Sequence, residues 1–333
     1  MIIPFFIPHS GCPHHCVFCN QNSITGLFAS DDVSALPHKI AMFLRTHTDD
    51  QPVHIAFYGG SFTALPRETQ MQYLHAVQPF LQTGLIHSIR LSTRPDYITK
   101  EVLVLLRQYH VQTVELGVQS MNDDVLSRSG RGHTQSDTIN AVSLLKEEGF
   151  TIGLQLMLGL PGDSEKTLIE TVKSVIKMQP DFVRLYPLLV IHGTPLEKLL
   201  IDGYYVPLSL DEAVLLCHKA LMQFDEAEIP VTRIGLQPTE ALERPGVIIA
   251  GPYHPAFRQI VESSILLDKM RTALRKRLVQ TDIAVFTVHE KDFNAAIGQH
   301  RSNVIKLKKE FGLCTIRFVN SRHGTIKGQP ELL

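Results

Sequence analysis

Three of the five cysteines in this 333-residue chain lie within eight residues, in the order Cys12-x-x-x-Cys16-x-x-Cys19. Soft thiolate ligands favour zinc and iron–sulfur clusters over hard cations. Three thiolates in one loop can hold three corners of an iron–sulfur cube and leave the fourth iron open for another ligand. We therefore predict that these three cysteines ligate one iron–sulfur cluster.

A structural zinc site is the alternative, with His9, His14 or His15 as its fourth ligand. Zinc sites more often pair two cysteine clusters across a long spacer, and the other two cysteines, Cys217 and Cys314, form no second cluster. Their apolar surroundings predict that both lie in the core. An odd number of cysteines with tight clustering also argues against a disulfide framework.

The elements that position these residues are apolar, β-branched runs that alternate with helical patterns, which predicts parallel strands covered by helices. The expected strands are 2–8, 53–58, 88–93, 113–118, 151–158 and 182–190. The expected helices are 35–45, 67–81, 99–109, 136–148, 165–178, 196–201 and 210–226. Six such units in series indicate an α/β architecture with a parallel sheet.

Polar and glycine-rich segments follow the expected strands directly. They are Gly59-Gly60-Ser61, Arg94-Pro95-Asp96, Gln119-Ser120 and Gly159-Leu160-Pro161-Gly162. In parallel barrels the carboxyl ends of the strands hold the active site. Because the cysteine loop also follows a strand, we expect these segments to surround it.

The cysteine loop, with the aromatic Phe18 before the third cysteine, resembles that of the radical S-adenosylmethionine (SAM) enzymes. The resemblance implies a partial parallel (β/α)6 TIM-like barrel that holds one 4Fe–4S cluster. It implies that SAM chelates the open iron, that an electron from the cluster cleaves the sulfonium, and that a 5′-deoxyadenosyl radical results. The electron would come from a donor such as flavodoxin or ferredoxin.

The same resemblance assigns further residues to cofactor binding. Gly59, Gly60 and Ser61 match the glycine pair that meets the SAM amino group, although the family norm is Gly-Gly-Glu. Ser61 thus departs from the pattern, and backbone carbonyls would carry more of that contact. Ser92 matches the ribose-contacting position, and Met157 lies on the strand that matches the adenine side.

Two branches of the family are especially similar: the oxygen-independent coproporphyrinogen oxidases and the catalytic subunit of Elongator. The segment 115–120, followed by Arg131-Gly132-His133, implies that Gln119 and Arg131 contact SAM. The segments 185–196 and 251–257 point to the Elongator branch. Tyr186 ends the sixth strand and is predicted to face the substrate as a catalytic residue. Because the sequence ends at Leu333, we expect no acetyltransferase domain of the Elongator kind.

The sequence predicts a barrel over residues 1–230, a proline-rich connection over 231–264 and a small α+β domain over 265–333. From Leu266 onward there are 13 Lys and Arg against 6 Asp and Glu, whereas the whole chain has a net charge of −1. The excess of positive charge favours a polyanionic partner, with a merely solvated surface as the alternative.

The small domain resembles a KH domain, an RNA-binding module with a β-α-α-β core and a G-x-x-G loop. The loop here is Gly298-Gln299-His300-Arg301, so that arginine replaces the second glycine. This implies that loop amides and helix amino termini contact an RNA backbone. Lys306, Lys308 and Lys309 would extend the positive field. A KH-shaped fold that only supports the barrel is the alternative.

The sequence thus predicts a radical SAM enzyme that modifies tRNA or another RNA. One alternative is an enzyme acting on a small molecule or tetrapyrrole, similar to the coproporphyrinogen oxidases. Another is an RNA-binding regulator whose cluster senses oxygen or iron without cleaving SAM.

Hydrophobic residues make up 44% of the chain, but no apolar run approaches the roughly 20 residues that span a bilayer. We expect no membrane partner and a cytoplasmic location.

Overall fold

The computed structural model describes residues 1–7, 12, 14, 16–20, 33–46, 51–276, 282–321 and 330–332. The chain divides into two compact units, one made of Met1–Ser209 with Met222–Tyr253 and the other of Leu210–Leu221 with His254–Leu333. These limits differ from the three predicted segments. The proline-rich stretch 231–264 is not a separate connection, because its residues up to Tyr253 belong to the first unit and the rest to the second.

The first unit contains a seven-stranded sheet in the order β1-β2-β3-β4-β5-β6-β8. Every neighbouring pair of strands is parallel. The strands are β1 (Ile2–Phe6), β2 (His54–Tyr58), β3 (Ser88–Thr93), β4 (Val111–Gln119), β5 (Thr151–Leu158), β6 (Phe182–Pro187) and β8 (Val231–Ile234). The predicted partial parallel barrel is confirmed, with a seventh strand added at its edge.

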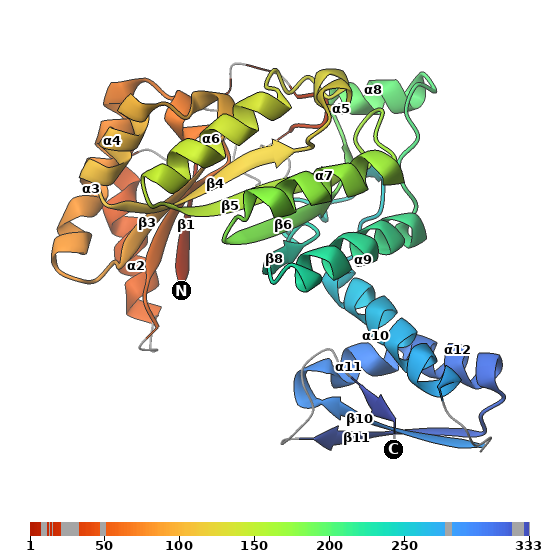
Figure 1. The fold of residues 1–333 in the computed structure, drawn as a ribbon. Helices are drawn as coiled ribbons and strands as arrows, with labels where there is room; N and C mark the ends of the chain where they lie inside the picture. The colour runs from red at the N-terminus through yellow and green to blue at the C-terminus, as the bar shows by residue number, and fades with distance from the viewer. Residues whose placement is uncertain are drawn as a thin grey trace. The chain divides into compact units, whose positions relative to one another are not determined.

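Helices connect successive strands, and Figure 1 shows several of them running along one side of the curved sheet. They are α2 (Leu36–Thr46), α3 (Arg67–Gln82), α4 (Lys100–Gln108), α5 (Asp123–Arg128), α6 (Gln135–Glu147), α7 (Glu165–Met178), α8 (Pro195–Ile201) and α9 (Leu210–Glu226). Capping fixes several starts. For example, Thr134 and Asp137 form a reciprocal capping box at α6, and Ser164 and Thr167 form one at α7.

The two faces of this sheet differ in burial. Side chains on the outer face, such as Ile55, Leu116 and Leu154, are almost completely buried. Alternate positions on the inner face are partly exposed and include polar side chains, such as Arg90 and Gln155. Because successive side chains of a strand point to opposite faces, one sheet offers both a packed core and a polar inner surface.

The segment after residue 230 holds more regular structure than the prolines suggest. Val231–Ile234 forms β8, which pairs with β6. Farther along, β9 (Ile248–Ala250) pairs antiparallel with β7 (Val190–Ile191). Helix α10 (Phe257–Arg275) begins inside the predicted connection. Prolines mark the ends of these short elements, but β-branched residues between them still add strands to the sheets.

The second unit contains a three-stranded sheet in the order β11-β10-β12 with helices beside it. Its elements after α10 are β10 (Ile283–His289), α11 (Phe293–Ile297), α12 (Ser302–Phe311), β11 (Thr315–Ser321) and β12 (Glu331–Leu332). The buried amide of Asn303 donates to the carbonyls of Ser263, Ala295 and Ala296, so one side chain joins three helices. The β-α-α-β order expected in the small domain over 265–333 is present as β10, α11, α12 and β11.

The two lone cysteines lie in different surroundings. Cys217 is fully buried on α9, as predicted. The prediction that Cys314 is a core residue is wrong, because its side chain is exposed while Leu313 and Ile316 take the inward positions. None of the helices in the described ranges is long and apolar enough to span a membrane.

Candidate functional site

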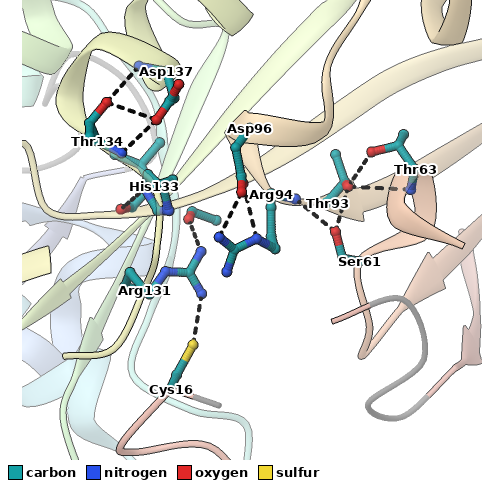
Figure 2. A network of polar contacts seen from close by, with 12 residues as sticks. Cys16, Ser61, Thr63, Thr93, Arg94, Asp96, Arg131, His133, Thr134 and Asp137 are labelled. Atoms are coloured by element: carbon teal, nitrogen blue, oxygen red, sulfur yellow. Dashed lines mark hydrogen bonds and ion pairs between the residues drawn. The ribbon is translucent and has the colours of Figure 1, made fainter. Parts of the chain in front are cut away.

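The carboxyl ends of β2, β3 and β4 bring the polar post-strand segments together, as expected from their place in the sequence. Figure 2 shows Ser61, Arg94 and Arg131 around a common space, with Cys16 beside Arg131. We call this group, together with Cys12 and Gln119, the rim site.

Arg131 connects the cysteine loop to the sheet. Its Nη1 donates to the Sγ atom of Cys16 at 3.4 Å, and its Nη2 donates to the carbonyl oxygen of Gly117. The side chain is buried, and its Nε has no partner among the described residues. A Cβ at Gly117 would lie 3.2 Å from Nη2 of Arg131, so glycine leaves room for the guanidinium.

Gln119 ends β4 in a left-handed backbone conformation with φ of 66°. A residue other than glycine pays roughly 1–2 kcal/mol for this conformation. The residue is 6% exposed, and its Oε1 has no hydrogen-bond partner among the described residues. A strained backbone that presents an unsatisfied buried acceptor is typical of a ligand site rather than of a packed core.

The hydroxyl of Ser61 contacts neighbouring strand ends and does not take part in the cofactor contact that the resemblance implies. Its Oγ lies 3.0 Å from Oγ1 of Thr93 and accepts from the backbone N–H of Arg94 at 3.3 Å. The hydroxyl therefore braces the ends of β2 and β3. The backbone of Ser61 lies close to Cys12 and is among the groups that lower the pKa of its thiol.

Cys12 lies close to Cys16 and to two arginines. Burial raises the pKa of the Cys12 thiol and the neighbouring Cys16 raises it further, whereas Arg131 and Arg94 lower it. The backbone N–H of Cys19 donates to the carbonyl of Cys16 at 3.1 Å. In the described part of the chain, no three His, Cys, Asp or Glu side chains are gathered closely enough to hold a metal ion.

The histidines of the zinc alternative are placed only in part. His14 is exposed, and its ring packs against Gly132, where an added Cβ would come within 2.5 Å of it. His9 and His15 lie outside the described residues. The zinc alternative therefore gains no support from the described histidine.

The chemistry of the rim site fits an iron–sulfur cluster with SAM. Cys16 of the cysteine loop lies beside the Arg131 guanidinium, and cysteine sulfur atoms are the usual ligands of iron–sulfur clusters. Orphaned buried atoms on Gln119 and Arg131 offer one acceptor and one donor to a ligand that carries both amino and carboxylate groups. These residues would hold SAM beside the three cysteines.

The remaining predicted cofactor residues lie nearby in two groups. Gly60 and Ser92 line one small hollow together with Tyr58, and Gly59 adopts a φ of 99° that favours glycine. Phe18 and Met157 both pack against one apolar cluster. That cluster is made of Val125, Leu160, Leu188, Val190, Leu196 and Tyr205.

Tyr186 is buried near the end of β6, next to Met157 in the strand register. Burial raises the pKa of its phenol, and a hydrogen bond with Arg184 lowers it. The phenol therefore stays protonated at neutral pH and can donate a hydrogen bond.

Sequence reasoning left three charged or titratable residues without a role. Arg94 is buried and pairs with Asp96 through contacts of 2.8 and 3.0 Å. Burial and the nearby Arg131 and Arg94 lower the pKa of His133 to about 4. Glu115 lies on the inner face of β4 and binds two arginines. The signal for Arg94 and Glu115 was their position directly after β3 and within β4, whereas His133 lies between α5 and α6 and was marked only by its place two residues after Arg131.

The loop expected to contact RNA lies in the second unit. Gly298 needs to be glycine, because a Cβ there would lie 2.5 Å from the Oγ atom of Ser302. His300 and Arg301 are exposed and left-handed, with φ of 50° and 62°. Gln299 is half-buried in the same loop, and Lys306 and Lys309 are exposed on the following helix.

A wider hollow of about 310 Å³ lies at the opposite end of the strands, where β3 and β4 begin. It is lined by His87, Arg107 and Glu148 among others. The hollow contains none of the rim residues, so its size does not identify the site.

Comparison with known proteins agrees with this geometry. The Radical SAM superfamily matches residues 6–175, about half of the chain, and the Radical SAM C-terminal domain matches residues 180–266. The tRNA uridine(34) acetyltransferase of Methanocaldococcus infernus is 28% identical over 61% of this chain and 46% of its own length. Human Elongator complex protein 3 is 29% identical over 64% of this chain and 47% of its own length. The chain thus spans about half the length of these relatives.

Solved structures share the fold. Archaeal Elp3 from M. infernus has a TM-score of 0.61 at 23% identity, covering 79% of this chain and 62% of its own. Coproporphyrinogen III oxidase from Escherichia coli has a TM-score of 0.50 at 18% identity, covering 68% and 52%. Both branches named from the motifs are therefore represented.

The superfamily consists of enzymes that use a 4Fe–4S cluster and SAM, and the rim residues fit both cofactors. The cysteine spacing, the fold and the family match agree along the first half of the chain. This chain belongs to the radical SAM superfamily.

Proposed function

We propose that the chain cleaves SAM reductively at a 4Fe–4S cluster held by Cys12, Cys16 and Cys19, and that it modifies tRNA. When bound, the cluster and SAM supply a 5′-deoxyadenosyl radical that abstracts hydrogen. The cluster requires a one-electron donor of the flavodoxin or ferredoxin type. A tRNA substrate is consistent with a cytoplasmic location.

The observation that carries the SAM part of the proposal is that the Arg131 and Gln119 side chains both lie beside Gly117, and that each has a buried polar atom without a partner among the described residues. Arg131 anchors one end of its guanidinium on Gly117 and the other on Cys16, so its position is fixed before any ligand arrives. The orphaned oxygen of Gln119 can accept from an ammonium group. A fixed donor and a fixed acceptor beside the cysteine loop would orient the amino acid part of SAM.

Tyr186 and the surrounding inner face would meet the substrate. The phenol is buried, and because burial raises its pKa it is protonated at neutral pH. It can therefore orient a polar group of the substrate or protect a radical from water, without itself changing charge at neutral pH.

The tRNA part of the proposal has two supports. The matched relatives include a tRNA uridine(34) acetyltransferase and an Elongator subunit. Independently, the second unit presents a G-x-x-R loop with exposed Arg301, followed by exposed Lys306 and Lys309. A positive loop at the start of a helix suits phosphate groups of an RNA backbone. In this proposal Gly298, Gln299 and His300 shape the loop.

The test is an anaerobic incubation of the reconstituted protein with SAM, a reductant and total tRNA. 5′-Deoxyadenosine is measured by chromatography, and tRNA nucleosides are measured by mass spectrometry. We expect 5′-deoxyadenosine to accumulate and a nucleoside of altered mass to appear.

The matched variants are Cys16→Ala and Cys314→Ala, each of which removes one thiol. Cys314 is exposed in the second unit, so its loss should leave the reaction unchanged. Cys16→Ala should abolish both the cluster absorbance and 5′-deoxyadenosine formation. A cluster without SAM cleavage would favour a sensing regulator, and tetrapyrrole binding without RNA affinity would favour the coproporphyrinogen oxidase type of enzyme.

A further inference from the structure

A second polar cluster lies on the inner face of the barrel, and neither the cysteines nor the rim residues belong to it. Oε1 of Glu115 accepts from Tyr58 Oη at 2.8 Å and from Arg184 Nη2 at 3.0 Å. The same oxygen accepts from Nε and Nη2 of Arg90 at 3.1 and 2.7 Å. We call Tyr58, Arg90, Glu115 and Arg184, together with Tyr186 and Arg233, the inner-face cluster.

The register of the sheet assembles this cluster from five strands. Tyr58, Arg90 and Glu115 come from β2, β3 and β4, Arg184 and Tyr186 come from β6, and Arg233 comes from β8. Arg184 and Arg233 are register partners. The carboxyl group of Glu115 is 5% exposed and the two paired arginines are 15% and 18% exposed, so these charges are largely withdrawn from water.

The cluster carries more positive than negative charge. Three arginines face one glutamate, and both ion pairs use the same carboxylate oxygen. Arg233 forms no ion pair with the described residues, yet its charge acts on the Tyr186 phenol. Largely buried charge is costly unless it is matched, so the surplus of guanidinium groups needs an explanation.

The hydrogen bonds of the cluster are also incomplete. Nε of Arg184 is buried and has no partner among the described residues. The guanidinium itself stacks 5.5 Å from the ring centre of Tyr58, and that of Arg90 lies 5.5 Å from the ring centre of Phe182. Stacking and ion pairs fix both planes, so these arginines are already arranged to bind a planar or tetrahedral anion.

We propose that the inner-face cluster binds an oxyanion group of the substrate, a phosphate or a carboxylate, through Arg184 and Arg233. Arg184 precedes Tyr186 by two residues on the same strand face, a separation of about 6–7 Å along the strand. An anion held there would place the adjoining part of the substrate beside Tyr186 and toward the rim. The inference rests on the proposed function, because that function places SAM at the rim.

The test measures binding by calorimetry on the full chain, reconstituted anaerobically. The probes are inorganic phosphate and propionate, each titrated into the wild-type protein and four variants: Arg184→Gln, Arg184→Lys, Arg233→Gln and Arg107→Gln. In Arg184→Gln and Arg233→Gln the association constant of the preferred probe should fall at least tenfold. Arg107→Gln is the matched control, because that exposed arginine pairs with Glu148 outside the cluster.

Further measurements separate this site from the SAM site. Iron content and SAM affinity should be unchanged in Arg233→Gln, whose guanidinium lacks an ion pair within the described chain. If Arg184→Gln does not fold, Arg233→Gln decides the question. Arg184→Lys should bind the probe at an intermediate level, since lysine keeps the charge but not the two-pronged geometry.

The source of the anion follows from the preferred probe. Phosphate that binds more tightly and is displaced by tRNA identifies an RNA phosphate. Propionate that binds more tightly and is not displaced identifies a small acid. The proposal would be overturned if each probe bound to Arg233→Gln with the same association constant as to the wild-type protein. That result stands even if SAM is never cleaved, so it is distinct from a failure of the proposed function.

Discussion

Residues other than glycine adopt the left-handed region both at the rim and in the loop of the second unit, but in opposite surroundings. At the rim, Gln119 is strained and buried, and one polar atom lacks a partner within the described chain. In the second unit, His300 and Arg301 are strained and exposed. Similar backbone strain therefore occurs at a buried polar position in one case and on an open surface in the other.

The two regions differ in whether water can form the hydrogen bonds that a polar side chain lacks when no ligand is bound. An exposed arginine keeps its hydration and loses little when no ligand is present. A buried polar group gives up its hydration when the protein folds, and only neighbours or a ligand restore the lost hydrogen bonds. Substitutions in the buried polar regions should therefore affect stability or ligand affinity strongly, and substitutions in the exposed loop should act weakly and through salt.

The largest effect is expected on the buried side, at Glu115. Glu115→Gln removes the one negative charge that contacts Arg90 and Arg184 in the described chain. Breaking a buried ion pair costs about 3–5 kcal/mol of unfolding free energy. Urea denaturation should show this loss, and Glu147→Gln is the control because that side chain is exposed and accepts a hydrogen bond from the Ser143 hydroxyl at 3.2 Å, away from the buried arginines. Equal stability of the two variants would contradict a buried charge network.

The next effect depends on pH and concerns His133. Its Nε2 donates to the carbonyl of Val118 at 3.2 Å, and burial is the main reason that its pKa falls from 6.5 to about 4. In the unfolded chain His133 is protonated below pH 6.5, whereas in the folded chain it is protonated only below about pH 4. Stability should therefore decrease as the pH falls from 6.5 to 4, by about 3 kcal/mol in total.

His133→Gln provides the comparison for that measurement. Glutamine can still donate to Val118 but does not titrate. Denaturation curves collected between pH 7 and pH 4 should thus be flatter for this variant than for the wild type. Identical slopes would show that His133 is accessible to protons in the folded state.

A smaller effect is expected at Gln119, in affinity rather than stability. Gln119→Ala removes the orphaned acceptor while keeping a similar backbone strain. A hydrogen bond to a charged group contributes about 1.5–3 kcal/mol, which corresponds to a SAM affinity lower by roughly 10- to 100-fold. Calorimetric titration with SAM measures the change, at unchanged iron content. An unchanged affinity would remove Gln119 from the SAM site.

The sequence predicts the regular elements better than the contacts between them. Helix α7 is found with its bounds, because Ser164 caps its start and its apolar residues recur at helical spacing. The short strands β7 and β9 are missed, since they form only when distant segments pair. Cys314 is misplaced because a strand pattern does not reveal which of two neighbouring residues points inward.

The candidate site divides in the same way. The cysteine spacing and the positions of Gln119 and Arg131 follow from the sequence motifs. The inner-face cluster does not, because Arg90, Glu115 and Arg184 meet only through the register of four strands. Likewise, the structural use of the Ser61 hydroxyl depends on its contact with Thr93 across two strands.

The smallest effect is expected in the exposed loop and tests whether Arg301 is retained for its charge. Arg301→Gly relieves left-handed strain of about 1–2 kcal/mol, offset by about 0.5–1 kcal/mol of glycine backbone entropy. The second unit should therefore gain up to about 1.5 kcal/mol. If Arg301 contacts a phosphate, tRNA affinity should fall and its dependence on log salt should become shallower by about 0.7–0.9.

His300→Gly is the matched control for Arg301→Gly, because it relieves similar strain in the same exposed loop. It leaves the Arg301 guanidinium in place. Both variants should be stabilised alike, but only Arg301→Gly should change the salt dependence of tRNA binding. If the two variants bind tRNA equally well, Arg301 does not contact a phosphate group. The loop of the second unit would then differ from the rim in its exposure to solvent, but not in binding a different kind of ligand.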